Sequence, residues 1–198
     1  MGIFDNFVYK DGEIVDNNWV KWFHWGVPDK EGKEREDARV DLEKLGHCRP
    51  CTVLSGCYFV KSKLPEKLAE GDGLLHPHCD CILKNIFNSI IKADCKIEKF
   101  SRYIFSKKYE ENGKKVLFES FGYTMEDSEW LKAEYERQAK QKYLNGAYII
   151  RGLNPQYGQD INIVIELLTP IGRRVEIISG WKVHPLGLIT CNTPLADD

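Results

Sequence analysis

The chain has 198 residues, of which 42% are hydrophobic and 29% charged, with 28 Lys and Arg against 30 Asp and Glu. This composition predicts a folded globular protein and argues against extensive disorder. The net charge of −2 argues against a strongly basic nucleic-acid-binding protein, and no apolar run reaches the roughly twenty residues of a membrane helix.

The N-terminal segment MGIFDNFVYKDGE carries acidic residues early and has no long apolar core. It therefore does not read as a secretory signal, and we expect a cytoplasmic protein. In a reducing compartment, clustered cysteines hold metal more often than they form disulfides. The following aromatic residues fit either one face of a helix or a short buried segment: Trp19, Trp22, Phe23 and Trp25.

The next elements complete an N-terminal module. Residues 29–45 are highly charged and read as an amphipathic helix that stops at Gly46. A short apolar run predicts a strand at residues 58–60, and the polar segment 61–73 reads as a loop. We place a domain boundary near Lys92, which gives an N-terminal module of residues 1–92 and a second domain of residues 93–198.

The second domain begins with helical patterns. Asp94 is expected to cap a first helix that buries Ile97, Phe100 and Ile104. A short helix is expected at 114–121. A longer helix, capped by Asp127 or Ser128 and ending before Gly146, spaces three residues for burial: Leu131, Tyr135 and Ala139.

Four runs rich in β-branched residues follow the helices, and they predict strands at 147–152, 161–168, 173–183 and 187–191. Helices first and a strand meander afterwards indicate an α+β domain with an antiparallel sheet that is covered on one side.

Five of the seven cysteines lie in two short segments, GHCRPCTVLSGCYF at 46–59 and LLHPHCDCIL at 74–83. Zinc prefers four Cys or His ligands, and structural sites commonly take them as two local pairs. Cys48 and Cys51 form one such pair. His76, Cys79 and Cys81 compete for the two remaining places, with His78 as a further candidate.

Other readings of the cysteines are open. A redox CxxC normally lies in a βαβ unit, which this sequence does not predict, and a disulfide framework would require secretion. A Cys/His catalytic pair is a third reading, although catalytic thiols rarely come with several further cysteines. A catalytic zinc is a fourth, although the available ligands can close a tetrahedral shell. Cys57, Cys95 and Cys191 lie in apolar surroundings and are expected to be buried as small hydrophobic residues.

The cysteine segments resemble the zinc knuckle of phage Mu F-type head morphogenesis proteins. The resemblance covers residues 46–83 and implies a zinc site and an origin in a phage or mobile element. It rests on the following residues: Cys48, Cys51, Leu54, Gly56, Phe59, His76, Pro77, Cys79 and Cys81.

Residues 93–198 resemble an uncharacterised C-terminal domain of bacterial polymorphic toxins and phage-linked proteins. The resemblance implies an effector activity, for which RNA cleavage is the commonest chemistry. The matching residues are Lys99, Tyr103, Lys115, Phe118, Phe121, Gly122, Gly172, Arg173, Trp181 and Thr190.

RNA cleavage without metal needs a base, an acid and cations for the phosphate. The candidate catalytic residues are Lys115, Arg173, His184 and Thr190, with Trp181 or Tyr157 as a surface for base stacking. A tryptophan in an apolar strand, such as Trp181, is more often a core residue than a stacking surface. Residues 93–198 carry fifteen Lys and Arg against fifteen Asp and Glu, a neutral balance that argues against a nuclease.

We therefore expect a zinc-binding effector related to phage or toxin proteins. In one hypothesis it is a metal-independent ribonuclease acting on host RNA. In the other it is a non-catalytic protein that binds a host protein or a nucleotide signal. Membrane association is not expected.

Overall fold

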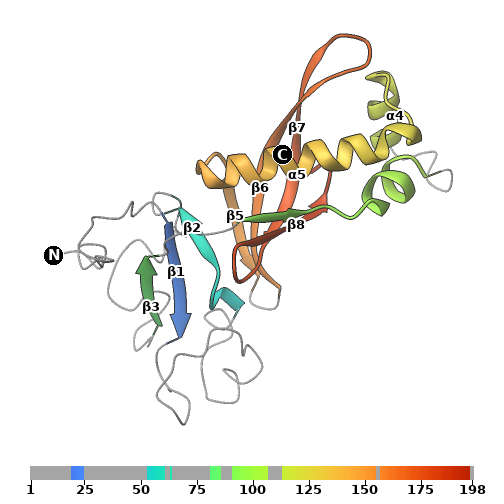
Figure 1. Ribbon diagram of the computed structural model, residues 1–198. Helices are drawn as coiled ribbons and strands as arrows, with labels where there is room; N and C mark the ends of the chain where they lie inside the picture. The colour runs from blue at the N-terminus through green and yellow to red at the C-terminus, as the bar shows by residue number, and fades with distance from the viewer. Residues whose placement is uncertain are drawn as a thin grey trace. The chain divides into compact units, whose positions relative to one another are not determined.

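The computed structural model describes residues 53–60, 63, 91–106, 113–154 and 157–196, together with the backbone of two further strands at 19–24 and 81–85 (Figure 1). The chain forms two compact units. One comprises residues 1–91, 150–160 and 183–188, and the other comprises residues 92–149, 161–182 and 189–198. The helix predicted at 29–45 lies outside the described residues.

The first unit contains a three-stranded sheet in the order β2-β1-β3. Its strands are β1 (Trp19–His24), β2 (Tyr58–Val60) and β3 (Cys81–Asn85). The strand expected at 58–60 is confirmed. The aromatic segment at 19–24 is a strand, so the helical alternative for it is wrong.

The second unit begins with its helical part, which contains η3 (Lys99–Ile104), α4 (Gly113–Ser120), η5 (Met125–Asp127) and α5 (Ser128–Leu144). The two longer helices confirm the prediction to within a residue or two. The cap predicted at Asp94 is wrong, because Asp94 lies in a strand and Glu98 is the N-cap residue of η3. None of the described helices is long and apolar enough to cross a bilayer.

A five-stranded sheet follows the order β4-β8-β7-β6-β5. Its strands are β4 (Lys92–Asp94), β5 (Ile149–Asn154), β6 (Gly158–Leu168), β7 (Arg174–Val183) and β8 (Leu188–Thr193). Four strands were predicted; the short β4 was not, because three polar or small residues carry no alternating pattern. The α+β fold class is confirmed.

The core of the second unit lies between α5 and one face of this sheet, across which α5 runs in Figure 1. Alternate residues of β6 and β7 are buried, as period-2 side-chain direction requires. Leu131, Tyr135 and Ala139 are fully buried, as their spacing predicted. Cys95 and Cys191 of this unit are buried, as is Cys57 of the first unit, which confirms the expectation for these three.

Candidate functional site: a groove beside the free edge of strand β6

Strand β6 has one edge that β5 covers only in part. β6 has 11 residues and β5 has 6, and the two follow each other through a short hairpin connection. The last five residues of β6, 164–168, therefore extend past β5. We call these residues the free edge of β6. An uncovered edge presents backbone N–H and C=O groups that need partners.

Side chains of α5 and the preceding loop occupy this edge. Gln138 donates from Nε2 to the carbonyl of Glu166 at 2.6 Å, and its Oε1 accepts from the Glu166 N–H at 2.9 Å. Lys142 donates to the carbonyl of Val164 at 2.7 Å. The hydroxyl of Tyr123 donates to the carbonyl of Leu168 at 3.2 Å. The amide of Gln138 therefore takes the place of a neighbouring strand.

α5 can follow the free edge of β6 because the repeat distances of a helix and a strand are similar. Four helical residues advance about 6 Å, and two strand residues advance about 6.7 Å. Gln138 and Lys142 are four residues apart in α5, and their partners Glu166 and Val164 are two residues apart in β6. One side of the helix can thus follow the strand edge step by step.

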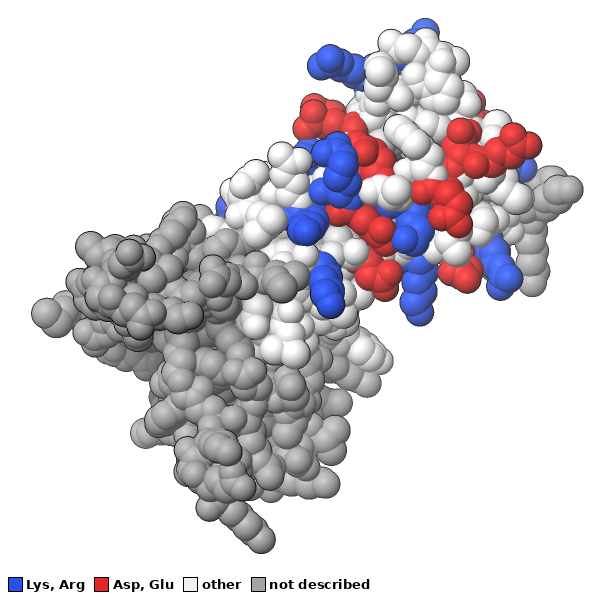
Figure 2. Space-filling view, in the orientation of Figure 1, with Lys and Arg blue, Asp and Glu red and all other residues white. Residues whose placement is uncertain are grey.

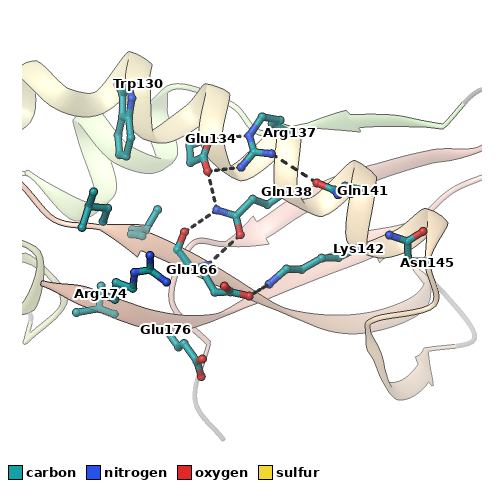
Figure 3. Close-up of a pocket in the computed structure, with 13 residues that line it drawn as sticks. Trp130, Glu134, Arg137, Gln138, Gln141, Lys142, Asn145, Glu166, Arg174 and Glu176 are labelled. Carbon is teal, nitrogen blue, oxygen red and sulfur yellow. Dashed lines mark hydrogen bonds and ion pairs between the residues drawn. The ribbon is translucent and has the colours of Figure 1, made fainter.

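A groove of about 1000 Å³ lies along this contact (Figure 3). Residues of α5 line one side of it, and the end of β6 with the start of β7 line the other. The residues that carry its charged and apolar chemistry are Trp130, Glu134, Arg137, Lys142, Glu166, Leu168, Arg174 and Glu176.

Most charges in the groove are paired. Arg137 donates to both carboxylate oxygens of Glu134, at 2.8 and 2.6 Å, and Lys142 lies 2.7 Å from Glu166. The hydrogen bond from Arg137 lowers the pKa of Glu134, and the hydrogen bond from Lys142 lowers that of Glu166. On the face shown in Figure 2, acidic and basic side chains are interleaved and no broad area of one sign appears.

One end of the groove carries an aromatic pair. The rings of Tyr123 and Trp130 stack with centroids 5.8 Å apart and an interplanar angle of 23°. Burial raises the pKa of Tyr123 to about 12, so its hydroxyl remains a donor to Leu168 at physiological pH. Trp130 is 49% exposed and Leu168 is 64% exposed. The exposed side chain of Trp130 is therefore held by the ring of Tyr123, and the backbone of the exposed Leu168 is held by the hydroxyl of Tyr123.

The turn between β6 and β7, residues 169–173, is closed by its own hydrogen bonds. The N–H of Thr169 donates to the carbonyl of Arg173 at 2.8 Å, and the N–H of Arg173 donates to the Thr169 hydroxyl at 3.0 Å. Gly172 has a φ of 79°, which glycine adopts without strain. The hydrogen bond between Thr169 and Arg173 pairs these two residues across the hairpin. The same antiparallel register places Leu168 opposite Arg174 and Glu166 opposite Glu176.

This chemistry suits binding better than proton transfer. The lining includes carboxylates, cations, amides and apolar groups, but no His among the described residues. A general acid or base works best with a pKa near the operating pH, whereas Glu134 and Glu166 are held further below it.

The four candidate catalytic residues lie on separate elements. Lys115 is in α4, where its ammonium lies 3.9 Å from Glu119. Arg173 directly precedes β7 and His184 directly follows it. At about 3.3 Å per strand residue, more than about 30 Å of strand separates these two, so one phosphate cannot contact both. Thr190 is in β8.

The two candidate stacking residues have different environments. Trp181 is fully buried, and its indole N–H donates to the hydroxyl of Ser179 at 2.8 Å. Trp181 is therefore a core residue, and its use as a surface for a base is wrong. Tyr157 is 57% exposed.

Most of the predicted zinc ligands, Cys48, Cys51, His76 and Cys79, lie outside the described residues, as does His78. Cys81 begins β3, where the antiparallel register places it opposite His24 of β1. In the part of the chain that the structure describes, no three His, Cys, Asp or Glu residues come together as a metal site.

Sequence reasoning did not find the groove. The helix α5 has apolar residues at helical spacing. Its residues Trp130, Gln138 and Lys142 fall outside that apolar stripe and look like ordinary surface positions in the sequence. One signal was available: β6 is predicted longer than the strand before it, so part of its edge has to be covered by something else.

Comparisons with known protein families, with characterised proteins and with solved structures give no match to this chain.

Proposed function

We propose that this chain is a zinc-stabilised binding protein, whose second unit binds another protein through the groove beside α5. Zinc holds the N-terminal module in this proposal, and the groove provides the contact surface. The relationship to phage or toxin proteins remains a proposal that rests on sequence resemblance.

The order of strands supports the zinc site. Both β2 and β3 run antiparallel to β1, which lies between them. Tyr58 at the start of β2 pairs with Lys21, and Cys81 at the start of β3 pairs with His24. The chain therefore enters both outer strands from the same end of the sheet. Cys48 and Cys51 precede one strand, and His76 and Cys79 precede the other.

Metal analysis tests this site. We expect about one zinc per chain, because four Cys or His ligands complete a tetrahedral shell. Cys51→Ser should lose the metal and unfold the N-terminal module, since metal-binding free energy here is folding free energy. Cys95→Ser, which changes a buried thiol of the other unit, is the matched control and should keep the zinc. A wild-type chain without zinc would contradict the site.

The observation that carries the binding proposal is the exposed pair Trp130 and Leu168. These two apolar side chains lie in a groove whose charged side chains are mostly paired with each other. Trp, Tyr and Arg are enriched at the residues that dominate the affinity of protein interfaces. Trp130 is already held by Tyr123, so little freedom of this side chain is lost on binding.

A photo-crosslinking amino acid at Leu168 tests this surface in cells that express the full chain. We expect one discrete crosslinked product, and we expect Trp130→Ala to remove it. The same amino acid at Lys140, an exposed residue of α5 outside the groove lining, should not give that product. Crosslinking that is equal from both positions, or unaffected by Trp130→Ala, would contradict the proposal.

Incubation of the purified protein with total RNA distinguishes the ribonuclease hypothesis from the binding proposal. Under the binding proposal, purified protein leaves RNA intact. If RNA is cleaved, and Lys115→Ala or His184→Ala abolishes the cleavage, the chain is an enzyme and the binding proposal is wrong as stated.

A further inference from the structure

We infer that the groove accepts an acidic polypeptide segment that carries one large apolar side chain. This inference rests on the protein-binding function proposed above, and it names the chemistry of the partner.

The apolar part of the partner is assigned to the end of the groove at Trp130 and Leu168. These two side chains both line the groove and are about half exposed or more. Tyr123 supports both residues, because its ring stacks on Trp130 and its hydroxyl holds the Leu168 carbonyl. A flat, fixed apolar surface of this kind binds an aromatic or aliphatic side chain at small entropic cost.

The acidic part of the partner is assigned to Arg174, which lines the groove and whose side chain is exposed. Arg174 contributes to the lowered pKa of Glu166, but among the described residues it has no ion pair of the kind that Arg137 and Lys142 form. A guanidinium offers several N–H donors in a plane that matches a carboxylate. Arg174 also lies opposite Leu168, so the cationic and apolar contacts are neighbours on one surface.

The turn that precedes Arg174, residues 169–173, is held in place. Thr169 closes it through backbone and side-chain hydrogen bonds. Its residues Pro170 and Ile171 lie so close to Gly122 that a Cβ there would be 3.0 Å from the Ile171 Cγ2 atom. The φ of Gly122 is 86°, a second reason for glycine at this position. Arg174 therefore follows a turn that is packed against the end of α4.

An acidic peptide fits this surface better than RNA. A nucleic-acid strand carries a negative charge at every nucleotide and needs a continuous series of cations. The groove places Glu134, Glu166 and Glu176 between its cations. A short segment with one anionic end can contact Arg174 and keep its apolar side chain away from these carboxylates.

Short fluorescein-labelled peptides test the inference with the full chain. One peptide has several Asp or Glu residues beside a single Leu or Trp, a second replaces the acids by Lys, and a third keeps the acids without the apolar residue. A labelled RNA oligonucleotide is the fourth probe. Fluorescence anisotropy should show that the first peptide binds most tightly, with an affinity that falls as salt is raised.

Substitutions at two nearby residues of opposite charge, Arg174 and Glu176, should change the affinity in opposite directions. We expect Arg174→Gln to weaken binding of the acidic apolar peptide about tenfold, as the loss of one charged hydrogen bond implies. Glu176→Gln should strengthen the same binding, because it removes a like charge. Arg151→Gln, which changes an exposed arginine on β5, should have no effect. Trp130→Ala should weaken binding at least about tenfold.

Tighter binding of the Lys peptide or of RNA would overturn the inference, as would equal effects of Arg174→Gln and Glu176→Gln. If the crosslink from Leu168 is present but no acidic peptide binds, the partner class is wrong and the binding function stands. If the crosslink is absent as well, both fail. Thermal unfolding of each variant confirms that the compared proteins are folded.

Discussion

The second unit shows two surfaces that α5 shares with the sheet, and they are built differently. On the core side, Leu131, Tyr135 and Ala139 pack against the buried face of the sheet. On the groove side, Gln138 and Lys142 bond to the backbone of the free edge of β6. Apolar packing is tolerant of direction, whereas these hydrogen bonds fix the helix at one position along the strand.

This difference indicates why the groove is available to a partner. If the edge carried an ordinary strand, the concave surface beside α5 would be filled. Because side chains occupy the edge, its backbone groups have partners and an open surface remains above Glu166 and Leu168. The same arrangement blocks unwanted pairing with another strand, which is a known hazard of exposed edges.

The two tryptophans of this unit give the largest predicted contrast. Trp181→Ala should lower the free energy of unfolding by about 3–5 kcal/mol, because it leaves a cavity in a closed core. Trp130→Ala changes a half-exposed side chain and should cost less than about 1 kcal/mol, while it removes binding. Urea unfolding measures both. Equal losses would show that the aromatic pair belongs to the core.

The two glutamines of α5 give the next contrast. Gln138→Leu leaves the N–H and C=O of Glu166 without their partner and should cost about 1–3 kcal/mol. Gln141→Leu changes a residue whose bond to Arg137 is long, at 3.5 Å, and should cost less than about 0.5 kcal/mol. Amide exchange of Glu166 should become faster only in the first variant. Unchanged exchange in Gln138→Leu would contradict the edge contact.

A smaller effect is expected from the like charges at the end of the sheet. Glu166 and Glu176 are placed opposite each other by the hairpin register, and Lys142 compensates for this at 2.7 Å from Glu166. Lys142→Met should destabilise the protein less than Gln138→Leu does. Adding Glu176→Gln should recover part of that loss, and a double-mutant cycle measures the coupling. Strict additivity would show that the two carboxylates do not interact.

The smallest predicted effect is a dependence of stability on pH. The folded-state pKa of Glu134 is below 4.5, mainly because Arg137 donates to it. The ionised form is thus favoured by folding, so its contribution is present above the unfolded pKa and is lost as pH falls through the lower folded value. Wild type and Glu134→Gln should differ in stability at neutral pH, and the difference should shrink as the pH falls through the lowered folded-state pKa of Glu134. A difference that grows on acidification would contradict this sign.

Much of the fold could be predicted because its patterns are local. The burial of Leu131, Tyr135 and Ala139 follows from helical spacing, and β6 and β7 follow from runs of β-branched residues. The missing strand β4 has no such pattern, since Lys92–Asp94 joins the sheet through its backbone. The false cap at Asp94 has the same origin, because a good capping residue also occurs where no helix begins.

The candidate site depends on contacts between distant residues, and these are not visible in sequence. Gln138 and Glu166 are 28 positions apart, and their bond requires the register of α5 on β6. Arg173 was singled out with His184 as a catalytic candidate, but only the structure shows that the two lie at opposite ends of β7. The cysteine pattern is different: its spacing alone predicts a zinc site, which stays a prediction until metal is measured.

Amide hydrogen exchange of the full chain, with and without the acidic apolar peptide, tests most directly whether the groove is the binding surface. We predict slower exchange in residues 164–176 and at the exposed end of α5 near Trp130 when peptide is added, with β8 unchanged. Slower exchange confined to β8 or to the N-terminal module, or no change at saturating peptide, would contradict it.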